Sequence, residues 1–299
     1  MFNGHSAPVI SRGGGGLPSR IVLHGVEGIG KSSYAAFAPK PIFLMTRGET
    51  GLLTLIDNGL VPPTDHFDEI MDWPDLLRSI DYLIQNPRGN KTVVLDTVNG
   101  AERLCFEHIA GIKYQGDWEK FISYGKGPDI AANEFWPELL EKLGRLRQEQ
   151  KVMLVLLAHS KIKTFKNPLG DDYDRYAAEM HEKTWGHVAK WADIILFGNF
   201  DVLAEKGRGE LKAKGKSAGG RTMYTTRTAA FDAKNRHGLP ERISMGKEPH
   251  ESWANFVAAI KGARAAGQAQ PEPENPPATL PMTTSQEPVA EVDPNQPPF

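Results

Sequence analysis

The feature that most constrains what this chain can fold into is a glycine-rich segment close to its N-terminus. Residues 20–34 read RIVLHGVEGIGKSSY, in which an apolar run leads into every fixed position of the pattern G-x-x-x-x-G-K-[ST]. Glycines in such a loop allow backbone N–H groups to line a triphosphate without Cβ clashes, and the helix that follows adds the positive end of its dipole. The order of strand, loop and helix predicts an α/β fold that binds a nucleotide.

The same pattern predicts which residues contact the nucleotide. They are Gly25, Val26, Glu27, Gly28, Ile29, Gly30, Lys31, Ser32 and Ser33. Lys31 is expected to reach the β- and γ-phosphates, and the Ser32 hydroxyl to bind Mg²⁺. A second signal is the apolar strand of residues 92–97, TVVLDT, because a carboxylate such as Asp96 at the end of a buried strand holds Mg²⁺ directly or through water. The expected cofactors are therefore ATP and Mg²⁺, with Ser32 and Asp96 as metal ligands.

The composition excludes several other classes of protein. Of the 299 residues, 40% are apolar and 24% are charged, which is ordinary for a globular protein. Cys105 is the single cysteine, so a disulfide framework and a cysteine-based metal site are excluded. The chain has no apolar run long enough to span a membrane, and its first residues lack the apolar core of a signal peptide. We therefore expect a cytoplasmic protein that does not enter a membrane.

The distribution of residue types predicts one α/β domain between two loose ends. Residues 1–19 contain four consecutive glycines and form a flexible lead-in, and the domain covers residues 20–261. Within the domain, residues 201–236 combine many cations with glycines and predict a basic β-hairpin insertion, with residues 222–231 as one of its strands. Residues 262–299 contain nine prolines and five acids against one arginine, so we expect a disordered, Pro-rich, acidic tail.

Hydrophobic periodicity predicts the other elements. Strands are expected at residues 41–45, 152–157 and 193–200, and helices at 31–38, 75–85, 98–111, 130–150 and 250–261. Two polar stretches that also contain aromatic residues, 113–127 and 161–176, are expected to be irregular loops.

The predicted motifs, strands and helices, in this order along the chain, resemble the RecA-like core ATPases, and in particular the Sak-four group of bacteriophage recombination ATPases. The resemblance covers residues 20–261. It is carried by YGKGPDIAANEF (124–135), LLAHSK (156–161), NPLGDDYDRY (167–176), WADIILF (191–197) and AKNRHGLP (233–240). It implies a RecA-like P-loop NTPase core: a mostly parallel sheet flanked by helices, with a late antiparallel β-hairpin and disordered termini.

The resemblance also implies roles for single residues in ATP hydrolysis beyond Lys31 and Asp96. Glu49 matches the glutamate that activates water, although a surface-loop glutamate is the alternative. His159 falls where a γ-phosphate-sensing glutamine lies in RecA, and the alternative is a buried structural histidine. Lys234 and Arg236 match a pair of cations that enters the ATP site of a neighbouring subunit, with a solvated strand end as the alternative.

In the relatives, two loops line the DNA axis, and they correspond here to residues 113–127 and 161–176. Cations in such loops neutralise backbone phosphates, and flat rings stack on bases. The predicted DNA contacts are Lys113, Tyr124, Lys126, Lys161, Lys163, Lys166 and Arg175. Several acids dilute the charge of both stretches, and some of the aromatic residues could instead belong to the core.

The predicted function is that of an ATP-binding and ATP-hydrolysing phage recombination protein in the host cytoplasm. It would bind single-stranded DNA and promote annealing or pairing as a homo-oligomer, either a ring or a filament. A DnaB-like helicase or DNA motor and a P-loop small-molecule kinase are the alternatives. The C-terminal Pro298-Phe299 resembles the ends of bacterial single-strand-binding proteins, so the tail is a candidate peptide for binding single-strand-binding protein or host repair proteins, with an inert tail as the alternative.

Overall fold

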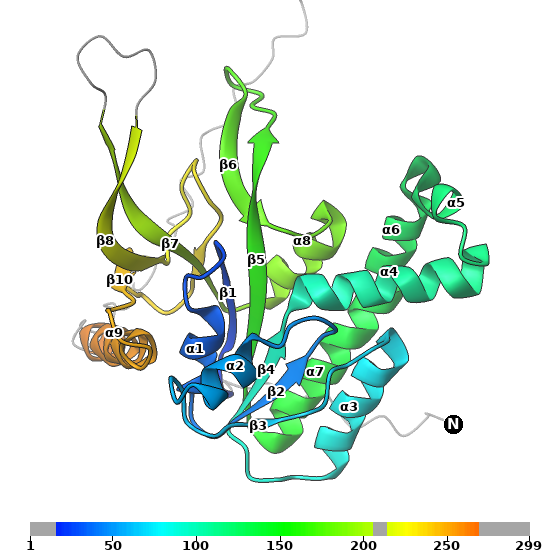
Figure 1. The fold of residues 1–299 in the computed structure, drawn as a ribbon, viewed down its shortest axis with the longest axis horizontal. Helices are drawn as coiled ribbons and strands as arrows, with labels where there is room; N and C mark the ends of the chain where they lie inside the picture. The colour runs from blue at the N-terminus through cyan, green and yellow to red at the C-terminus, as the bar shows by residue number, and fades with distance from the viewer. Residues whose placement is uncertain (1–15, 206–213, 269–299) are drawn as a thin grey trace, which may run out of the picture.

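A computed structural model describes residues 16–205 and 214–268 of the chain. Residues 1–15, the tip of the predicted basic hairpin at 206–213, and the predicted tail from residue 269, which includes Pro298-Phe299, lie outside the described residues. Within the described part, the strands form a mixed sheet in the order β10-β8-β7-β1-β5-β4-β2-β3, with β6 paired to β5 and β9 paired to β7. Figure 1 shows this arrangement.

The centre of the sheet is parallel and buried on both faces. Its strands are β1 (Arg20–Gly25), β2 (Pro41–Met45), β4 (Thr92–Asp96), β5 (Met153–Phe165) and β7 (Ile194–Glu205). These strands are continuous apolar runs in the parallel part because both of their faces pack against helices. Parallel pairing brings their carboxyl ends to one edge, where Gly25 lies opposite His159 and Asp96 lies opposite Leu157.

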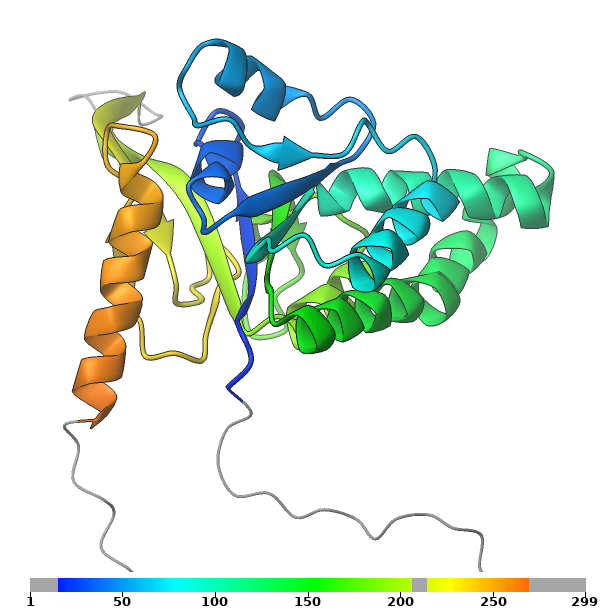
Figure 2. The ribbon, with the colours of Figure 1, turned by 90° about the horizontal axis from the view of Figure 1, so that it is seen from below.

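Helices cover the two faces of the sheet and enclose two hydrophobic cores. One face carries α3 (Trp73–Gln85), α4 (Val98–Tyr114), α7 (Trp136–Gln150) and α8 (Glu182–Trp191). The other carries α1 (Lys31–Ala36), α2 (Gly51–Asp57) and α9 (Glu251–Gln268). Figure 2 shows the two groups on opposite sides of the sheet. The predicted fold class is confirmed in its main features, an α/β core with a mostly parallel sheet flanked by helices.

The late antiparallel hairpin is also present, with different strand limits from those predicted. It is formed by β7 and β8 (Lys214–Tyr224), and β10 (Arg242–Ser244) pairs with the far side of β8. Of the strand predicted at 222–231, only residues 222–224 belong to β8, because the chain turns away after Tyr224 and the Thr225 hydroxyl donates to the carbonyl of Pro240. The remaining short strands are β3 (Asp65–His66) and β9 (Lys234–Asn235).

Regular structure makes up most of both predicted loops. The stretch 113–127 is mostly helical. α4 continues to Tyr114 and is followed by α5 (Trp118–Ile122). A 3₁₀ turn then covers Ser123–Gly125, and α6 (Lys126–Ile130) begins directly after it. A π-helical turn, Ala131–Phe135, then leads into α7. The stretch 161–176 is largely a β-hairpin, because β5 extends to Phe165 and pairs with β6 (Tyr173–Ala178).

The last helix is longer than predicted. α9 continues to Gln268, so the start of the predicted disordered tail at residue 262 falls inside a helix. No helix among the described residues combines the length and the apolar character needed to cross a membrane.

A fully buried histidine connects β1 to its neighbours directly before the phosphate-binding loop. The Nε2 atom of His24 lies 2.8 Å from the carbonyl oxygen of Asp232, and its Nδ1 atom lies 2.9 Å from Oγ of Ser160. Burial lowers the pKa of His24 from 6.5 to about 4. The neutral ring therefore donates from Nε2 to the carbonyl and accepts from the Ser160 hydroxyl at Nδ1.

We expect this histidine to make the fold sensitive to acid. Between pH 6.5 and about 4 the unfolded chain binds a proton at His24 that the folded chain excludes, so stability falls as the pH drops through this window. The difference in pKa corresponds to about 3 kcal/mol. His24→Gln keeps a donor for Asp232 and cannot be protonated. Urea unfolding of both proteins from pH 7 to pH 4 should show the free energies of unfolding converging on acidification, and parallel profiles would contradict the assignment.

Candidate nucleotide-binding site

The glycine-rich loop between β1 and α1 has the backbone conformation of a phosphate cradle. Gly28 and Gly30 have φ values of 69° and 101°, which side chains with a Cβ rarely adopt. Between them, the buried Ile29 packs beside Gly198 on β7 and anchors the loop to the sheet. The backbone therefore favours glycine at both positions, and Gly30 is one of the two glycines that the motif fixes.

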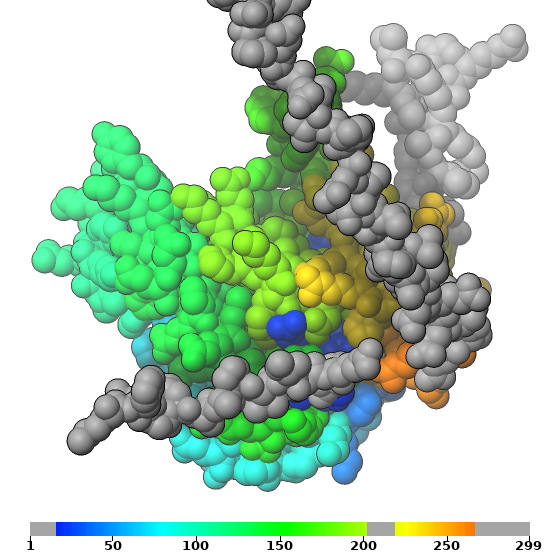
Figure 3. Space-filling model, turned by 180° about the vertical axis from the view of Figure 1, so that it is seen from behind, coloured from blue at the N-terminus to red at the C-terminus, as the bar shows by residue number. Residues whose placement is uncertain are grey.

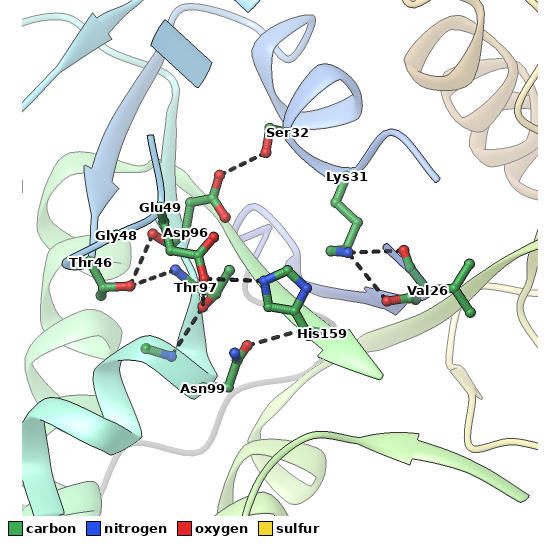
Figure 4. A network of polar contacts seen from close by, with 12 residues as sticks. Val26, Lys31, Ser32, Thr46, Gly48, Glu49, Asp96, Thr97, Asn99 and His159 are labelled. Atoms are coloured by element: carbon green, nitrogen blue, oxygen red, sulfur yellow. Dashed lines mark hydrogen bonds and ion pairs between the residues drawn. The ribbon is translucent and has the colours of Figure 1, made fainter. Parts of the chain in front are cut away.

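Lys31 lies inside the loop. Its Nζ atom donates to the carbonyl oxygens of Gly25 at 3.2 Å and Val26 at 3.1 Å (Figure 4). Burial lowers the pKa of the Lys31 ammonium, and the nearby carboxylates of Asp96 and Glu49 oppose this effect. The ammonium group is thus desolvated and close to where the loop would hold phosphates.

The two predicted metal ligands are in direct contact. The Ser32 hydroxyl donates to Oδ2 of Asp96 at 2.8 Å. Burial raises the pKa of Asp96 to about 6, because a carboxylate enclosed at the end of β4 is poorly solvated. A hydroxyl and a carboxylate are hard oxygen donors, and Mg²⁺ in nucleotide sites takes one or two protein ligands beside phosphates and water. The pair fits such an ion, although no cluster of three or more acidic, histidine or cysteine side chains suited to a metal occurs in the described residues.

Glu49 and His159 meet on the other side of Asp96. Oε1 of Glu49 accepts from Nε2 of His159 at 3.1 Å and from the Thr97 hydroxyl at 3.2 Å. The hydrogen bond from His159 holds the pKa of Glu49 below its ordinary value, so the carboxylate is ionised. The backbone N–H of His159 donates to Oδ1 of Asn99 at 3.1 Å, which fixes β5 against the start of α4. Figure 4 shows these side chains converging near Asp96 and Ser32.

The predicted catalytic and metal-binding side chains on this side of the sheet line one cavity of about 430 Å³, a volume ordinary for a small-molecule site. Its lining residues are Gly28, Gly30, Lys31, Ser32, Ser33, Glu49, Gly51, Leu55, Leu60, Asp96, His159, Arg221 and Pro249. The sequence did not point to Leu55, Leu60, Arg221 or Pro249, nor to the supporting Thr97 and Asn99. Thr97 and Asn99 follow Asp96 closely and could have been found by extending that motif, whereas Arg221 has no local signal.

Lys234 and Arg236 lie at the opposite edge of the sheet. β9 pairs with the first residues of β7, Ile194 and Ile195, so these cations are beside the amino end of this strand, whereas the glycine-rich loop packs against Gly198 further along it. Figure 3 shows this side of the molecule, with the yellow part of the chain next to the blue start of β1. Neither cation lines the cavity.

The two cations differ in how far they are engaged by neighbouring residues. Nζ of Lys234 donates to the carbonyl oxygens of Ala189 and Ala192 at 2.6 Å each, and to that of Lys190 at 3.1 Å, so it caps the C-terminus of α8. This corrects the expectation that Lys234 is a free finger, since its three donors bind the end of α8 in the same chain. Arg236 is 57% exposed, and its nearest acid, Asp193, lies 4.0 Å away.

The predicted DNA contacts fall on two separate parts of the surface (Figure 1). On the α4–α6 part, Tyr124 is 93% exposed, Lys126 is also exposed, and Lys113 pairs with Glu134 at 2.6 Å. On the β5–β6 hairpin, three exposed cations are Lys161, Lys163 and Lys166. Of these, Lys163 lies 3.5 Å from Glu182 and Lys166 lies 2.5 Å from Asp172.

Arg175 does not belong to this surface. Its side chain is 7% exposed and pairs with Asp232 at 2.5 Å, beneath the ring of Phe165. The prediction of Arg175 as a DNA contact on the surface is therefore wrong, because β6 directs this residue inward.

A comparison with known protein families agrees with the nucleotide binding that the glycine-rich motif predicts. Residues 17–237 match the family model described as AAA domain, which covers most of the chain. The chain belongs to this family. Membership in the AAA domain family implies nucleotide binding, and the matched range contains the loop, Asp96, Glu49 and His159.

The comparisons with solved structures and with curated proteins give little further information about this AAA domain. The chain is similar to a solved structure described as "Crystal structure of the RadB recombinase", with 13% sequence identity and a TM-score of 0.41 over 79% of this chain and 90% of that one. A likeness at this level carries no argument about function. No curated protein matches the chain.

Proposed function

We propose that this AAA domain hydrolyses ATP with Mg²⁺, and that it does so to act on single-stranded DNA as a recombination protein of the Sak-four type. The observation that carries the hydrolysis is the meeting of Glu49 and His159 with Asp96, Ser32 and Lys31 at one cavity. A protein that only bound nucleotide would have no need of an ionised carboxylate held beside the phosphate end of its site.

The residues divide the chemistry between them. Lys31 and the loop N–H groups stabilise charge on the phosphates, and Mg²⁺ held by Ser32 and Asp96 would supply further positive charge there. Glu49 orients the attacking water and takes its proton. His159 and Thr97 hold the Glu49 carboxylate in place, so a change at the phosphates can be transmitted along β5 through His159.

Glu49→Gln should separate binding from hydrolysis. We expect the rate of ATP hydrolysis to fall by about 100-fold or more, because the amide cannot take a proton, while the Kd for ATP changes by less than about threefold. Glu69→Gln is the matched control: its Oε2 accepts from the N–H of Gly48 at 2.7 Å, but it does not line the cavity. Equal activity of Glu49→Gln and wild type would exclude Glu49 as the base.

The proposal for DNA rests on the continuity of β5. Alternate residues of a strand share a face, so Lys161 and Lys163 lie on the same side of β5 as His159. A second cavity of about 360 Å³ at the β5–β6 hairpin is lined by Lys163, Phe165, Lys166 and Trp185, among others. Cations beside aromatic rings suit a single strand, because phosphates pair with the cations and bases stack on the rings. A strand held there would be close to the γ-phosphate side of the site.

The hairpin lysines should set the salt dependence of DNA binding. We expect Lys161→Gln, Lys163→Gln and Lys166→Gln together to reduce the slope of log K against log salt by about two, since each phosphate contact on a single strand contributes about 0.7. The matched control changes Lys40, Lys91 and Lys151 to Gln; these exposed lysines precede β2, β4 and β5 at the opposite edge of the sheet. Fluorescence anisotropy with a labelled oligonucleotide measures both sets.

Two further results of that experiment would redirect the proposal. Equal slopes for the two triple variants would place DNA elsewhere on the surface. Wild-type protein that unwinds duplex DNA in one direction, and does not anneal complementary strands, would favour the DnaB-like motor.

The proposal includes an oligomer in which Arg236 completes the ATP site of a neighbour. Arg236 is exposed and distant from its own cavity, as a residue that acts between subunits must be. We expect Arg236→Ala and Lys31→Ala each to abolish hydrolysis, and an equal mixture to regain about a quarter of the wild-type rate. Half of the sites then have an intact loop, and half of those face an intact Arg236. A mixture as inactive as its components would contradict a shared site.

Lys234 provides the control for this experiment. Lys234→Met removes three hydrogen bonds to the end of α8, so it should lower the free energy of unfolding by about 2 kcal/mol. Arg236→Ala should change it by less than about 0.5 kcal/mol, as is usual for an exposed side chain.

A further inference from the structure

An arginine outside the nucleotide-binding motifs forms part of the wall of the ATP cavity. Arg221 lies on β8, opposite Phe200 of β7, and its side chain crosses to the glycine-rich loop. Its Nη1 atom donates to the carbonyl oxygen of Ile29 at 3.3 Å. The contact is close, because a Cβ on Gly30 would lie 3.0 Å from the same nitrogen.

The other side of the guanidinium holds the turn that follows β10. Nε and Nη2 donate to the carbonyl oxygen of Gly246 at 3.2 and 3.0 Å, and Nη2 also donates to that of Lys247 at 3.0 Å. A guanidinium has five N–H groups, and these contacts use four of them. A phosphate could bind only the one remaining N–H group without displacing a backbone carbonyl. The geometry therefore suits a brace between two segments better than a phosphate clamp.

The turn at residues 246–249 is held by hydrogen bonds to a single carboxylate. Oε2 of Glu251 accepts from the N–H groups of Lys247 at 2.6 Å and Glu248 at 2.8 Å. Gly246 has a φ of 71°, and a Cβ there would lie 2.4 Å from Glu251. The turn ends at Pro249, which lines the ATP cavity.

Pro249 belongs to the apolar part of the cavity lining. Together with Leu55 of α2 and Leu60 after it, Pro249 contributes apolar surface, whereas Lys31, Asp96 and Glu49 contribute charge. The charged part suits phosphates and Mg²⁺, and the apolar part suits the flat face of a nucleobase. The family match ends at residue 237, so Pro249 and its turn lie beyond the matched part of the chain.

We propose that Arg221 is the positioning residue for the nucleoside end of the nucleotide. By tying the glycine-rich loop to the turn at residues 246–249, it holds Pro249 in place as the wall against which the base packs. The inference rests on the proposed function, since it takes ATP as the ligand. It differs from a phosphate-binding role because it predicts a loss of affinity that depends on the base and ribose.

Binding of three ligands to the full-length protein with Mg²⁺ tests this assignment. For Arg221→Gln we expect the Kd values of ATP and ADP to rise by about tenfold, while the Kd of inorganic tripolyphosphate changes by less than about twofold. The KM for ATP should rise with kcat unchanged within about twofold. Arg221→Lys should behave like Arg221→Gln, since different nitrogens of the guanidinium bind the carbonyl of Ile29 and those of Gly246 and Lys247, and the one nitrogen of a lysine cannot replace them.

The chain offers a matched control and a second variant. Arg242→Gln removes a guanidinium on β10 that stacks 5.5 Å from the ring of Tyr224 and does not line the cavity, so it should bind all three ligands as wild type does. Pro249→Gly removes the apolar wall without touching Arg221. It should weaken ATP and ADP and spare tripolyphosphate, and it decides the question if the Arg221 variants fail to fold.

Three results would contradict different parts of the proposal. Equal weakening of tripolyphosphate in Arg221→Gln would show that the guanidinium contacts phosphate directly, and unchanged ATP affinity in both Arg221→Gln and Pro249→Gly would show that the wall is not used. Failure of the wild type to bind ATP would defeat the proposed function itself.

Discussion

The site depends on the parallel pairing of β5 with β1 on one side and with β4 on the other. This register places Gly25 opposite His159 and Asp96 opposite Leu157, so the start of the glycine-rich loop, the buried carboxylate and the histidine meet at one edge of the sheet. Glu49 joins them from the loop after β2, which pairs with β4. A shift of register along β5 would separate His159 from Glu49, because each residue advances a strand by about 3.3 Å.

β5 also links the site to the surface. The strand does not end at the sheet edge but continues as half of a hairpin, so His159 and the exposed Lys161 and Lys163 belong to one rigid element. On the other side of β1, the β7–β8 hairpin returns Arg221 to the loop. Both hairpins thus extend from strands that flank β1. His159 of β5 and Arg221 of β8 line the same cavity.

Much of the fold followed from local patterns. The limits of β2 and β4 were predicted from buried apolar runs, and α3 from its spacing of apolar residues. The predictions failed where polar residues occupy regular structure. The stretch 113–127 is helical although it is polar, because Phe121 packs into the core beside Phe106. The stretch 161–176 is a hairpin because strand pairing with β6 satisfies the backbone of an exposed extension.

The sequence by itself determined the glycine-rich loop and the Asp96 strand, since each is a contiguous motif whose chemistry needs fixed residue types at fixed spacing. Only the tertiary structure decided what surrounds them. Glu49 and His159 are 110 positions apart, and Arg221 and Ile29 are 192 apart, so no local pattern could show that they touch. The same holds for the inward turn of Arg175 and for the cap that Lys234 makes on α8. Burial and pairing of such distant residues are properties of the packed chain. This is the physical reason that the positive charges of Arg175 and Lys234 alone led to wrong predictions of their contacts.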